Sequence, residues 1–146
     1  MSSSIDFEQL VRGMGDAVVV SDAQGAIVVW NDAATRLFGF SEEEALGHPL
    51  DLIIPDRLRG RHNEGYAKTV TTGITRYGTS LLKVPALHKD GRQLSIAFTV
   101  ALLTGPQDEV RGVAAIIRDD TARFNEDRAM RRRIAELEQA AARSAA

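Results

Sequence analysis

Apolar residues concentrate in two short runs near the start of the chain and in three longer runs in its second half. The first two, Ala17–Val20 and Ala26–Trp30, are rich in β-branched residues and flank a turn that ends in Gly25, which predicts a β-hairpin. The later runs, each bounded by turn-forming residues, are Tyr77–Leu87, Gln93–Leu103 and Val110–Arg118. We therefore predict two strands, a central segment and three further strands.

The central segment carries helix signals instead. Asn31 or Asp32 can cap a helix, and Ser41 with Glu44 three positions later is a capping-box pattern. A longer helix is predicted from Pro55 to about Thr72, because proline is tolerated in the first turn and a glycine follows. Strands, then helices, then strands predict an α+β domain, in which an antiparallel sheet has its helices on one face.

Both ends of the chain lie outside this pattern. Ile5, Leu10, Val11 and Met14 have near-helical spacing, which predicts a short amphipathic helix. After Asp120 the composition shifts to Arg, Glu and Ala, and an apolar stripe steps by four, three and four residues through Met130, Ile134, Leu137 and Ala141. That spacing is typical of paired, coiled-coil-like helices. We divide the chain into a flanking helix (1–14), a core domain (15–119) and a C-terminal helix (120–146).

Composition narrows the functions that the chain can have. Its 146 residues suffice for one domain with its own core. A net charge of -2 provides no field that would attract nucleic acid or an anionic membrane. Without cysteine, thiolate catalysis and thiolate metal sites are excluded. The chain shows neither a secretory signal nor an apolar run near the roughly 20 residues that cross a bilayer, so we expect a cytoplasmic protein.

Several short motifs occur in a specific order along the chain. They are Trp30–Ala34, Leu37–Phe40, Glu42–Gly47, Lys89–Gly91 before a strand, and Ile117–Thr121 before the last helix. In this order they resemble the PAS family over about residues 10–121. The resemblance implies a five-stranded antiparallel sheet, helices over one face and a small-molecule cavity between the layers. It also implies a sensor rather than an enzyme, which signals through its C-terminal helix within a homodimer to a downstream protein or a fused output domain.

A closer resemblance concerns the segment Ile54–His62. It is similar to the segment that precedes the haem-ligating histidine in oxygen-sensing PAS domains of rhizobial sensor kinases and direct-oxygen-sensor phosphodiesterases. This implies haem as the cofactor, His62 as its axial iron ligand, and gas or redox sensing as the function. Lys68 and Arg76 fall where basic residues face the haem propionates. The cavity-facing positions that complete the expected site are Tyr77, Ser80, Leu82, Phe98 and Val100.

Two of these positions depart from the haem sensors. Leu82 stands where the rhizobial sensors have an arginine that contacts bound oxygen, and Ser80 stands where the phosphodiesterase sensors have a methionine in the sixth coordination position. A polar contact to bound oxygen would then have to come from Tyr77 or Ser80.

Simpler interpretations of these residues stay open. His62 could be a helix-face histidine that binds nothing, with another small ligand or none in the cavity. The chain would then be a cofactor-free PAS module for dimerisation or protein interaction. We expect Asp119 and Asp120 to cap the exit helix, where the helix dipole favours negative charge, rather than to act as paired catalytic carboxylates. Acidic residues interleave with the arginine cluster at 128–133, which favours a solvated helix face.

Overall fold

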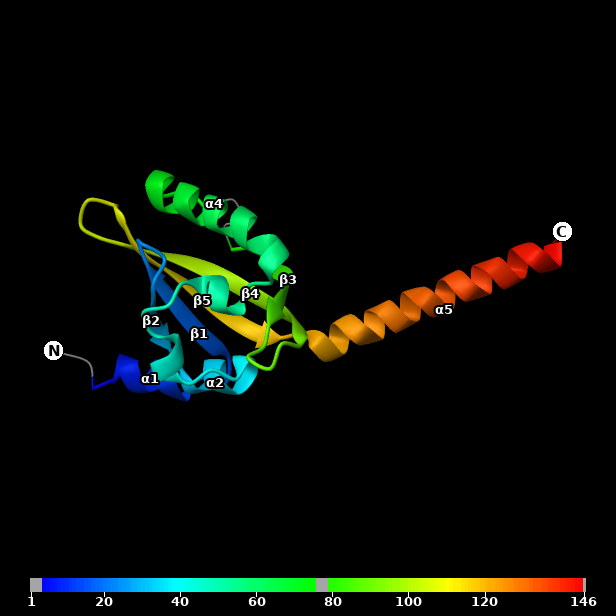
Figure 1. The fold of residues 1–146 in the computed structure, drawn as a ribbon, viewed down its shortest axis with the longest axis horizontal. Helices are drawn as coiled ribbons and strands as arrows, with labels where there is room; N and C mark the ends of the chain where they lie inside the picture. Colours follow the sequence, from blue (N-terminus) through cyan, green and yellow to red (C-terminus); the bar gives the residue numbers. More distant parts are fainter. Residues whose placement is uncertain (1–3, 76–78, 146) are drawn as a thin grey trace.

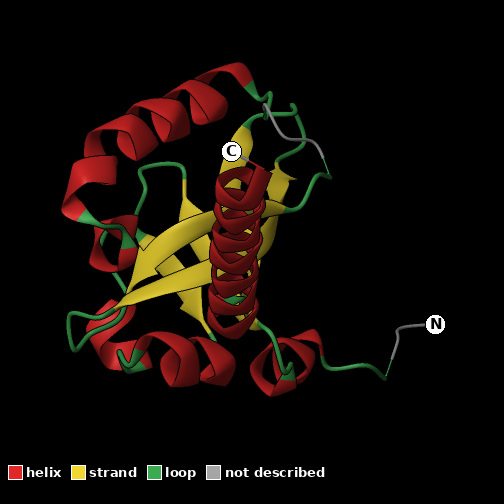
Figure 2. Ribbon diagram, turned by 90° about the vertical axis from the view of Figure 1, so that its right-hand side faces the viewer, coloured by secondary structure: helices red, strands yellow, loops and turns green. Residues whose placement is uncertain are grey.

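Helices pack around the sheet, and one long C-terminal helix projects away from it (Figures 1 and 2). The computed structural model describes residues 4–75 and 79–145. In these residues five strands pair in the order β2-β1-β5-β4-β3, and every neighbouring pair is antiparallel. The strands are β1 (Ala17–Asp22), β2 (Ile27–Trp30), β3 (Leu82–Leu87), β4 (Gln93–Thr104) and β5 (Val110–Asp119). The predicted α+β class and the five-stranded antiparallel sheet are confirmed.

The chain leaves the sheet at one edge and re-enters it at the other. Because β2 and β3 are opposite edge strands, the segment between them must cross a face of the sheet, and its helices cover that face. The helices of this segment are α2 (Asp32–Phe38), α3 (Glu42–Ala45), the 3-10 helix η1 (Leu50–Ile53) and α4 (Asp56–Thr72). Two helices lie outside it: α1 (Phe7–Gly13) precedes β1, and α5 (Thr121–Ala145) follows β5. The layer of helices on one face is therefore a consequence of strand order.

The third strand is shorter than the sequence suggests. We predicted a strand from Tyr77, but β3 begins at Leu82, where pairing with Phe98 of β4 starts. Leu81, just before it, is exposed, and Tyr77 lies outside the described residues. β-branched and aromatic residues favour a strand, but a strand forms only where a neighbour supplies hydrogen bonds.

The core follows the alternation of the strands. Successive strand residues point to opposite faces, so Ala17 and Val19 join the main core while Val18 and Val20 face the other side. Val11 and Met14, at the end of α1 and just after it, pack on that other side. The main core comprises Ala17, Val19, Ile27, Trp30, Ala33, Ala34, Phe38, Ala45, Ile53, Ala86, Leu94, Ile96 and Ile117.

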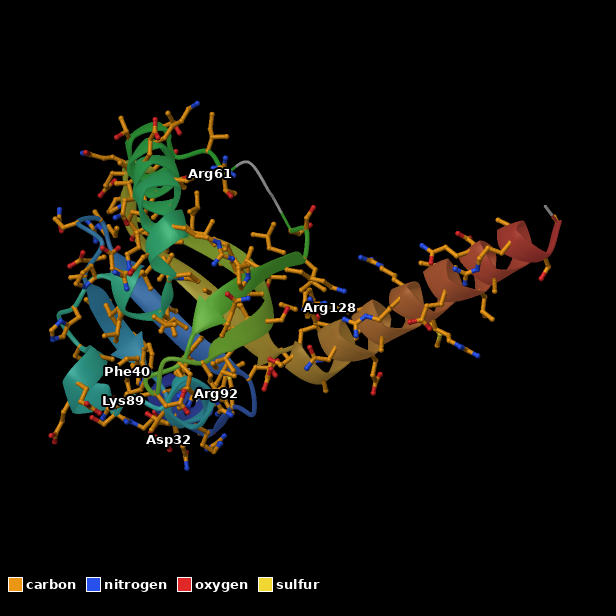
Figure 3. All side chains as sticks on the ribbon, turned by 45° about the vertical axis from the view of Figure 1, so that its right-hand side comes forward. Asp32, Phe40, Arg61, Lys89, Arg92 and Arg128 are labelled. Atoms are coloured by element: carbon orange, nitrogen blue, oxygen red, sulfur yellow. The ribbon has the colours of Figure 1, made fainter. Side chains whose placement is uncertain are left out.

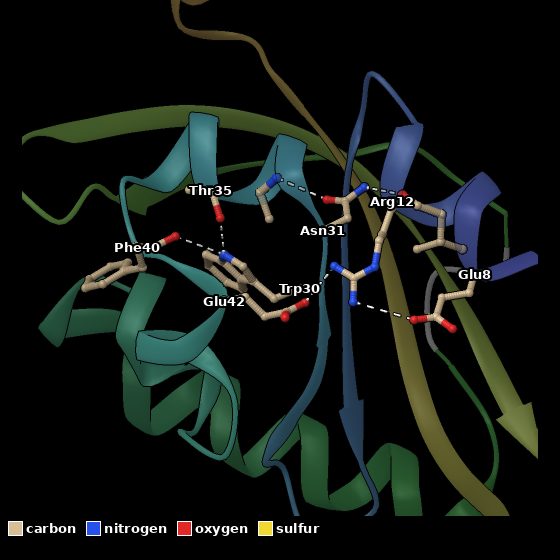
Figure 4. Close-up of polar contacts among 9 residues, drawn as sticks. Glu8, Arg12, Trp30, Asn31, Thr35, Phe40 and Glu42 are labelled. Carbon is tan, nitrogen blue, oxygen red and sulfur yellow. Dashed lines mark hydrogen bonds and ion pairs between the residues drawn. The ribbon is translucent and has the colours of Figure 1, made fainter.

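A buried asparagine joins α1, β1 and α2 (Figure 4). Asn31 is 2% exposed, and its Oδ1 accepts hydrogen bonds from the backbone N–H groups of Val18 (2.9 Å) and Ala34 (3.0 Å). Its Nδ2 donates to the carbonyl oxygens of Val11 (2.8 Å) and Asp16 (3.1 Å). The predicted N-cap of α2 is confirmed, and the same side chain also fastens α1 to the sheet.

The turn between β3 and β4 docks on α2 and α3. Gly39 ends α2 with φ 85°, and a Cβ there would lie 2.6 Å from the ring of His88. Lys89 donates its backbone N–H to Phe38 O (2.9 Å), and its Nζ lies 2.7 Å from Glu44 Oε2. A side chain at position 39 would therefore face both backbone strain and a steric clash.

The two longest helices make few buried contacts. Neither α4 nor α5 contains a buried residue. The α5 helix extends away from the sheet (Figure 1), and its side chains stand out on all sides, with Arg128 near its base (Figure 3). Along it Met130, Ile134 and Leu137 are 63%, 49% and 53% exposed. The stripe that we predicted for helix pairing is thus present on an exposed helix.

Candidate functional site

An apolar cavity lies between α4 and the sheet. Its volume is about 130 Å³. Strands β1, β3, β4 and β5 contribute to its wall, together with η1 and α4. The lining residues are Val19, Ser21, Leu50, Ile53, Ile54, His62, Tyr66, Val84, Pro85, Ala86, Ile96, Phe98, Val100, Val113, Ala115 and Ile117. The wall is therefore apolar apart from Ser21, His62 and Tyr66, a composition typical of small-molecule sites.

His62 reaches this cavity from the second turn of α4. It is half-buried, and burial lowers its pKa below the usual value, because desolvation disfavours the charged imidazole. Weaker effects from Asn63 and Asp51 act in the opposite direction. The ring Nδ1 lies 3.4 Å from Asn63 Oδ1, which favours the tautomer with the proton on Nδ1. Burial thus favours the neutral imidazole, and a proton on Nδ1 would leave the lone pair of Nε2 available.

Tyr66 lies one turn after His62 and lines the same cavity. The two ring centroids are 6.0 Å apart, as expected for positions i and i+4 of a helix. The Tyr66 hydroxyl donates to the backbone oxygen of Asp22, at 2.5 Å, at the end of β1 where the turn to β2 begins. Burial raises the pKa of Tyr66 above its usual value. The sequence interpretation missed this residue, although its spacing from His62 could have indicated it.

The residues predicted for the site are only partly brought together. His62, Phe98 and Val100 meet in the cavity wall. Leu82 is half-buried at the start of β3, opposite Phe98 but outside the wall, and Ser80 is exposed. Arg76 and Tyr77 lie outside the described residues.

Lys68 is exposed, in contrast to the two rings that precede it on α4. It follows Tyr66 by two positions, which turns the helix by about 200°. The lysine therefore points away from the cavity when His62 and Tyr66 point toward it. Contact between Lys68 and a group inside the cavity would require its long side chain to curl around the helix.

The donor set and the volume of the cavity have different implications for haem. Haem iron takes a single imidazole from many proteins, and a neutral histidine in an apolar slot suits that role. However, ligand pockets usually measure about 300–1,000 Å³, well above the 130 Å³ found here. A porphyrin would require α4 to lie further from the sheet, whereas a ligand of a few heavy atoms fits the cavity as it stands.

The junction between the sheet and α5 is held by hydrogen bonds. Ser95 of β4 donates its N–H to Thr121 Oγ1 (3.0 Å) and accepts from the N–H of Asp120 (2.8 Å). The Asp119 carboxylate accepts from the N–H of Thr121 (2.9 Å), and Lys83 Nζ lies 4.0 Å from Asp120 Oδ2. Asp119 and Thr121 therefore act at the start of the exit helix, and a displacement of β4 would reach α5 directly.

The sheet, the helices over one face and the apolar cavity define a sensory module of signalling proteins. The PAS fold pattern matches residues 5–119, and the chain belongs to the PAS family. Its fold is similar to the crystal structure of a PAS domain from Colwellia psychrerythraea, with a TM-score of 0.69 and 27% identity over 80% of this chain and 95% of that one.

Curated relatives include sensor proteins. The chain is 34% identical to an uncharacterized protein of Azorhizobium caulinodans over 123 residues (80% of this chain, 16% of that protein). It is 40% identical to the sensor protein FixL of Bradyrhizobium diazoefficiens over 63 residues (43% and 12%). It is 27% identical to the oxygen sensor protein DosP of Escherichia coli over 100 residues (68% and 12%). The chain thus spans less than a fifth of the length of these relatives.

Two further observations concern metal binding and membrane insertion. Within residues 4–75 and 79–145, no cluster of three or more His, Asp or Glu side chains is placed to share a metal ion. None of the described helices is both long and apolar enough to cross a bilayer.

Proposed function

We propose that this chain is the ligand-sensing module of a signalling protein and that its ligand is haem, held by His62. The observation that carries the proposal is the half-buried imidazole of His62 on the wall of a largely apolar cavity. When bound, haem would supply an iron that takes up a diatomic gas or changes redox state. The similarity to the oxygen sensor protein DosP supports oxygen as the gas.

Different residues of the chain would have different roles in binding such a ligand. His62 offers Nε2, and the contact of its Nδ1 with Asn63 fixes the ring orientation. Phe98 and Val100 of β4 provide an apolar surface opposite α4. Because β4 is bonded to the start of α5 through Ser95, a change in the packing of β4 would reach the exit helix.

The test is an absorption spectrum between about 350 and 600 nm after reconstitution with haemin. We expect a Soret band for the wild type and its loss in His62→Ala. His48→Ala is the matched control, since His48 is exposed and does not line the cavity. A colourless wild type, or a His62→Ala protein with an unchanged spectrum, would refute haem ligation by His62.

We further propose that α5 pairs with a second copy of the chain. Its apolar stripe is exposed, and Ile134 and Leu137 fit the positions that β-branched residues and leucine occupy in parallel two-stranded coiled coils. Light scattering after size-exclusion chromatography should give a dimer that Leu137→Glu disrupts. Gln139→Glu is the control, because it adds the same charge about 200° around the helix. A Leu137→Glu protein that stays dimeric would exclude pairing along this stripe.

The cofactor-free alternative has its own supporting observation, the small volume of the cavity. If the cavity stays closed, the chain would act as a dimerisation or protein-interaction module through α5 and the outer face of the sheet. The two proposals differ in the His62→Ala variant. The alternative predicts a colourless protein in which dimerisation does not depend on His62 or on added haemin.

A further inference from the structure

The hydroxyl of Tyr66 fastens α4 to the sheet. The Tyr66 hydroxyl donates to Asp22 O at 2.5 Å and so joins residues that lie 44 positions apart. Other side-chain hydrogen bonds of the described α4 residues stay local. Arg59 reaches carbonyl oxygens of the segment just before the helix, while Thr71 and Thr72 bond within it. The distance between the middle of α4 and the sheet therefore depends on Tyr66.

The tyrosine ring also packs against the turn that it binds. A Cβ on Gly25 would lie 3.9 Å from Tyr66 Cε1, so the ring is in van der Waals reach of the backbone of the β1–β2 turn. Its inner side lines the cavity together with Ser21, which is 1% exposed. Tyr66 thus closes the end of the cavity nearest this turn.

Little else holds α4 in place. The helix contains no fully buried residue, and its packing on the sheet depends on half-buried side chains such as His62 and Tyr66. It ends at Thr72, because Gly73 adopts a left-handed conformation (φ 69°) that stops the helix. Segments with few buried contacts open at low free energy.

We propose that Tyr66 sets the upper size limit of the ligands that this cavity admits, by holding α4 against the β1–β2 turn. With the hydrogen bond made, the cavity of about 130 Å³ accepts only ligands of a few heavy atoms. A larger ligand enters only when this hydrogen bond is broken. Its apparent affinity is therefore its intrinsic affinity multiplied by the fraction of molecules in which the bond is broken. This inference relies on the proposed function only in treating the cavity as a ligand site.

The experiment compares apolar probes of increasing size on the full chain. Benzene, naphthalene and anilinonaphthalene sulfonate would be titrated by calorimetry or fluorescence into the wild type and Tyr66→Phe. Thr71→Val is the control, because it also removes a hydroxyl from α4, one that bonds only to Ala67 O of the same helix. We expect equal benzene affinity in all three proteins, and roughly 3- to 10-fold tighter binding of the two larger probes to Tyr66→Phe.

Hydrogen exchange provides a second readout that does not need a ligand. Amides of α4 should exchange faster in Tyr66→Phe than in the wild type or Thr71→Val, while those of β4 and β5 should not. The proposal is overturned if Tyr66→Phe shows the size dependence of the wild type, if Thr71→Val behaves like Tyr66→Phe, or if no probe binds any variant. A protein that stays colourless with haemin but shows the size shift would refute haem and retain the role of Tyr66.

Discussion

Replacing Asn31 by alanine removes four hydrogen bonds at a site where three elements meet. The acceptor Oδ1 serves the backbone N–H groups of Val18 and Ala34, and Nδ2 serves the carbonyl oxygens of Val11 and Asp16. Since the side chain is 2% exposed, water cannot replace it without entering the core. We expect α1 to loosen from the sheet as the fold weakens.

The magnitude follows from which partners stay buried. Loss of an N-cap reduces stability by about 1 kcal/mol. Val18 lies in a buried stretch of β1, and a buried N–H left without an acceptor adds about 1–3 kcal/mol. The carbonyl oxygens at the edge of α1 can turn to solvent and contribute less. We therefore expect Asn31→Ala to lower the free energy of unfolding by about 2–4 kcal/mol, within the roughly 5–15 kcal/mol of a typical domain.

Urea unfolding followed by circular dichroism measures this loss, with Ser41→Ala as the matched control. Ser41 also caps a helix, since its Oγ accepts from Glu44 N at 3.1 Å, but this site is exposed. The control should therefore show only the cap contribution of about 1 kcal/mol. Equal losses in the two variants would refute the view that Asn31 satisfies buried groups of β1 beyond its role as a helix cap.

Three further outcomes are expected. The wild type should lose stability relative to His62→Ala as the pH falls below about 6.5. Burial lowers the pKa of His62 in the folded state, so the unfolded state binds the proton more readily. The same pH dependence of stability in both proteins would contradict this. Gly39→Ala should destabilise the fold by more than the roughly 1–2 kcal/mol expected for Gly47→Ala. Both glycines have φ 85°, but only Gly39 abuts the ring of His88. Equal decreases in melting temperature for the two variants would be inconsistent with the clash. Thr121→Val should speed amide exchange in the first turn of α5, because it removes the acceptor for a β4 N–H; unchanged exchange would mean that the junction does not depend on this hydroxyl.

Local chemistry made most of the fold predictable. The hairpin, the cap at Asn31 and the capping box of Ser41 with Glu44 depend on residues a few positions apart, and all are present. The strand predicted from Tyr77 starts later, at Leu82, because its extent depends on β4, a partner distant in sequence.

The candidate site was less accessible from sequence. The resemblance to haem sensors suggested His62, Phe98 and Val100 as cavity residues, and all three line the cavity from opposite sides. Tyr66 was missed although it lies one turn after His62, and its hydrogen bond to the backbone oxygen of Asp22, 44 positions away, could not be read from local sequence. The separation between α4 and the sheet depends on how two layers pack, so the volume of the cavity could not be read from residue types.

The length of α5 has a mechanical consequence. A helix of 25 residues is about 37 Å long, and it emerges from the sheet with its base fixed to β4. A tilt of about 10° at that base would swing the far end by about 6 Å, slightly more than one helical pitch. A small rearrangement inside the domain, of the size that a ligand of a few heavy atoms can produce, would thus move the far end of α5 by several ångströms. That movement is large enough to change which residues of a neighbouring helix α5 contacts.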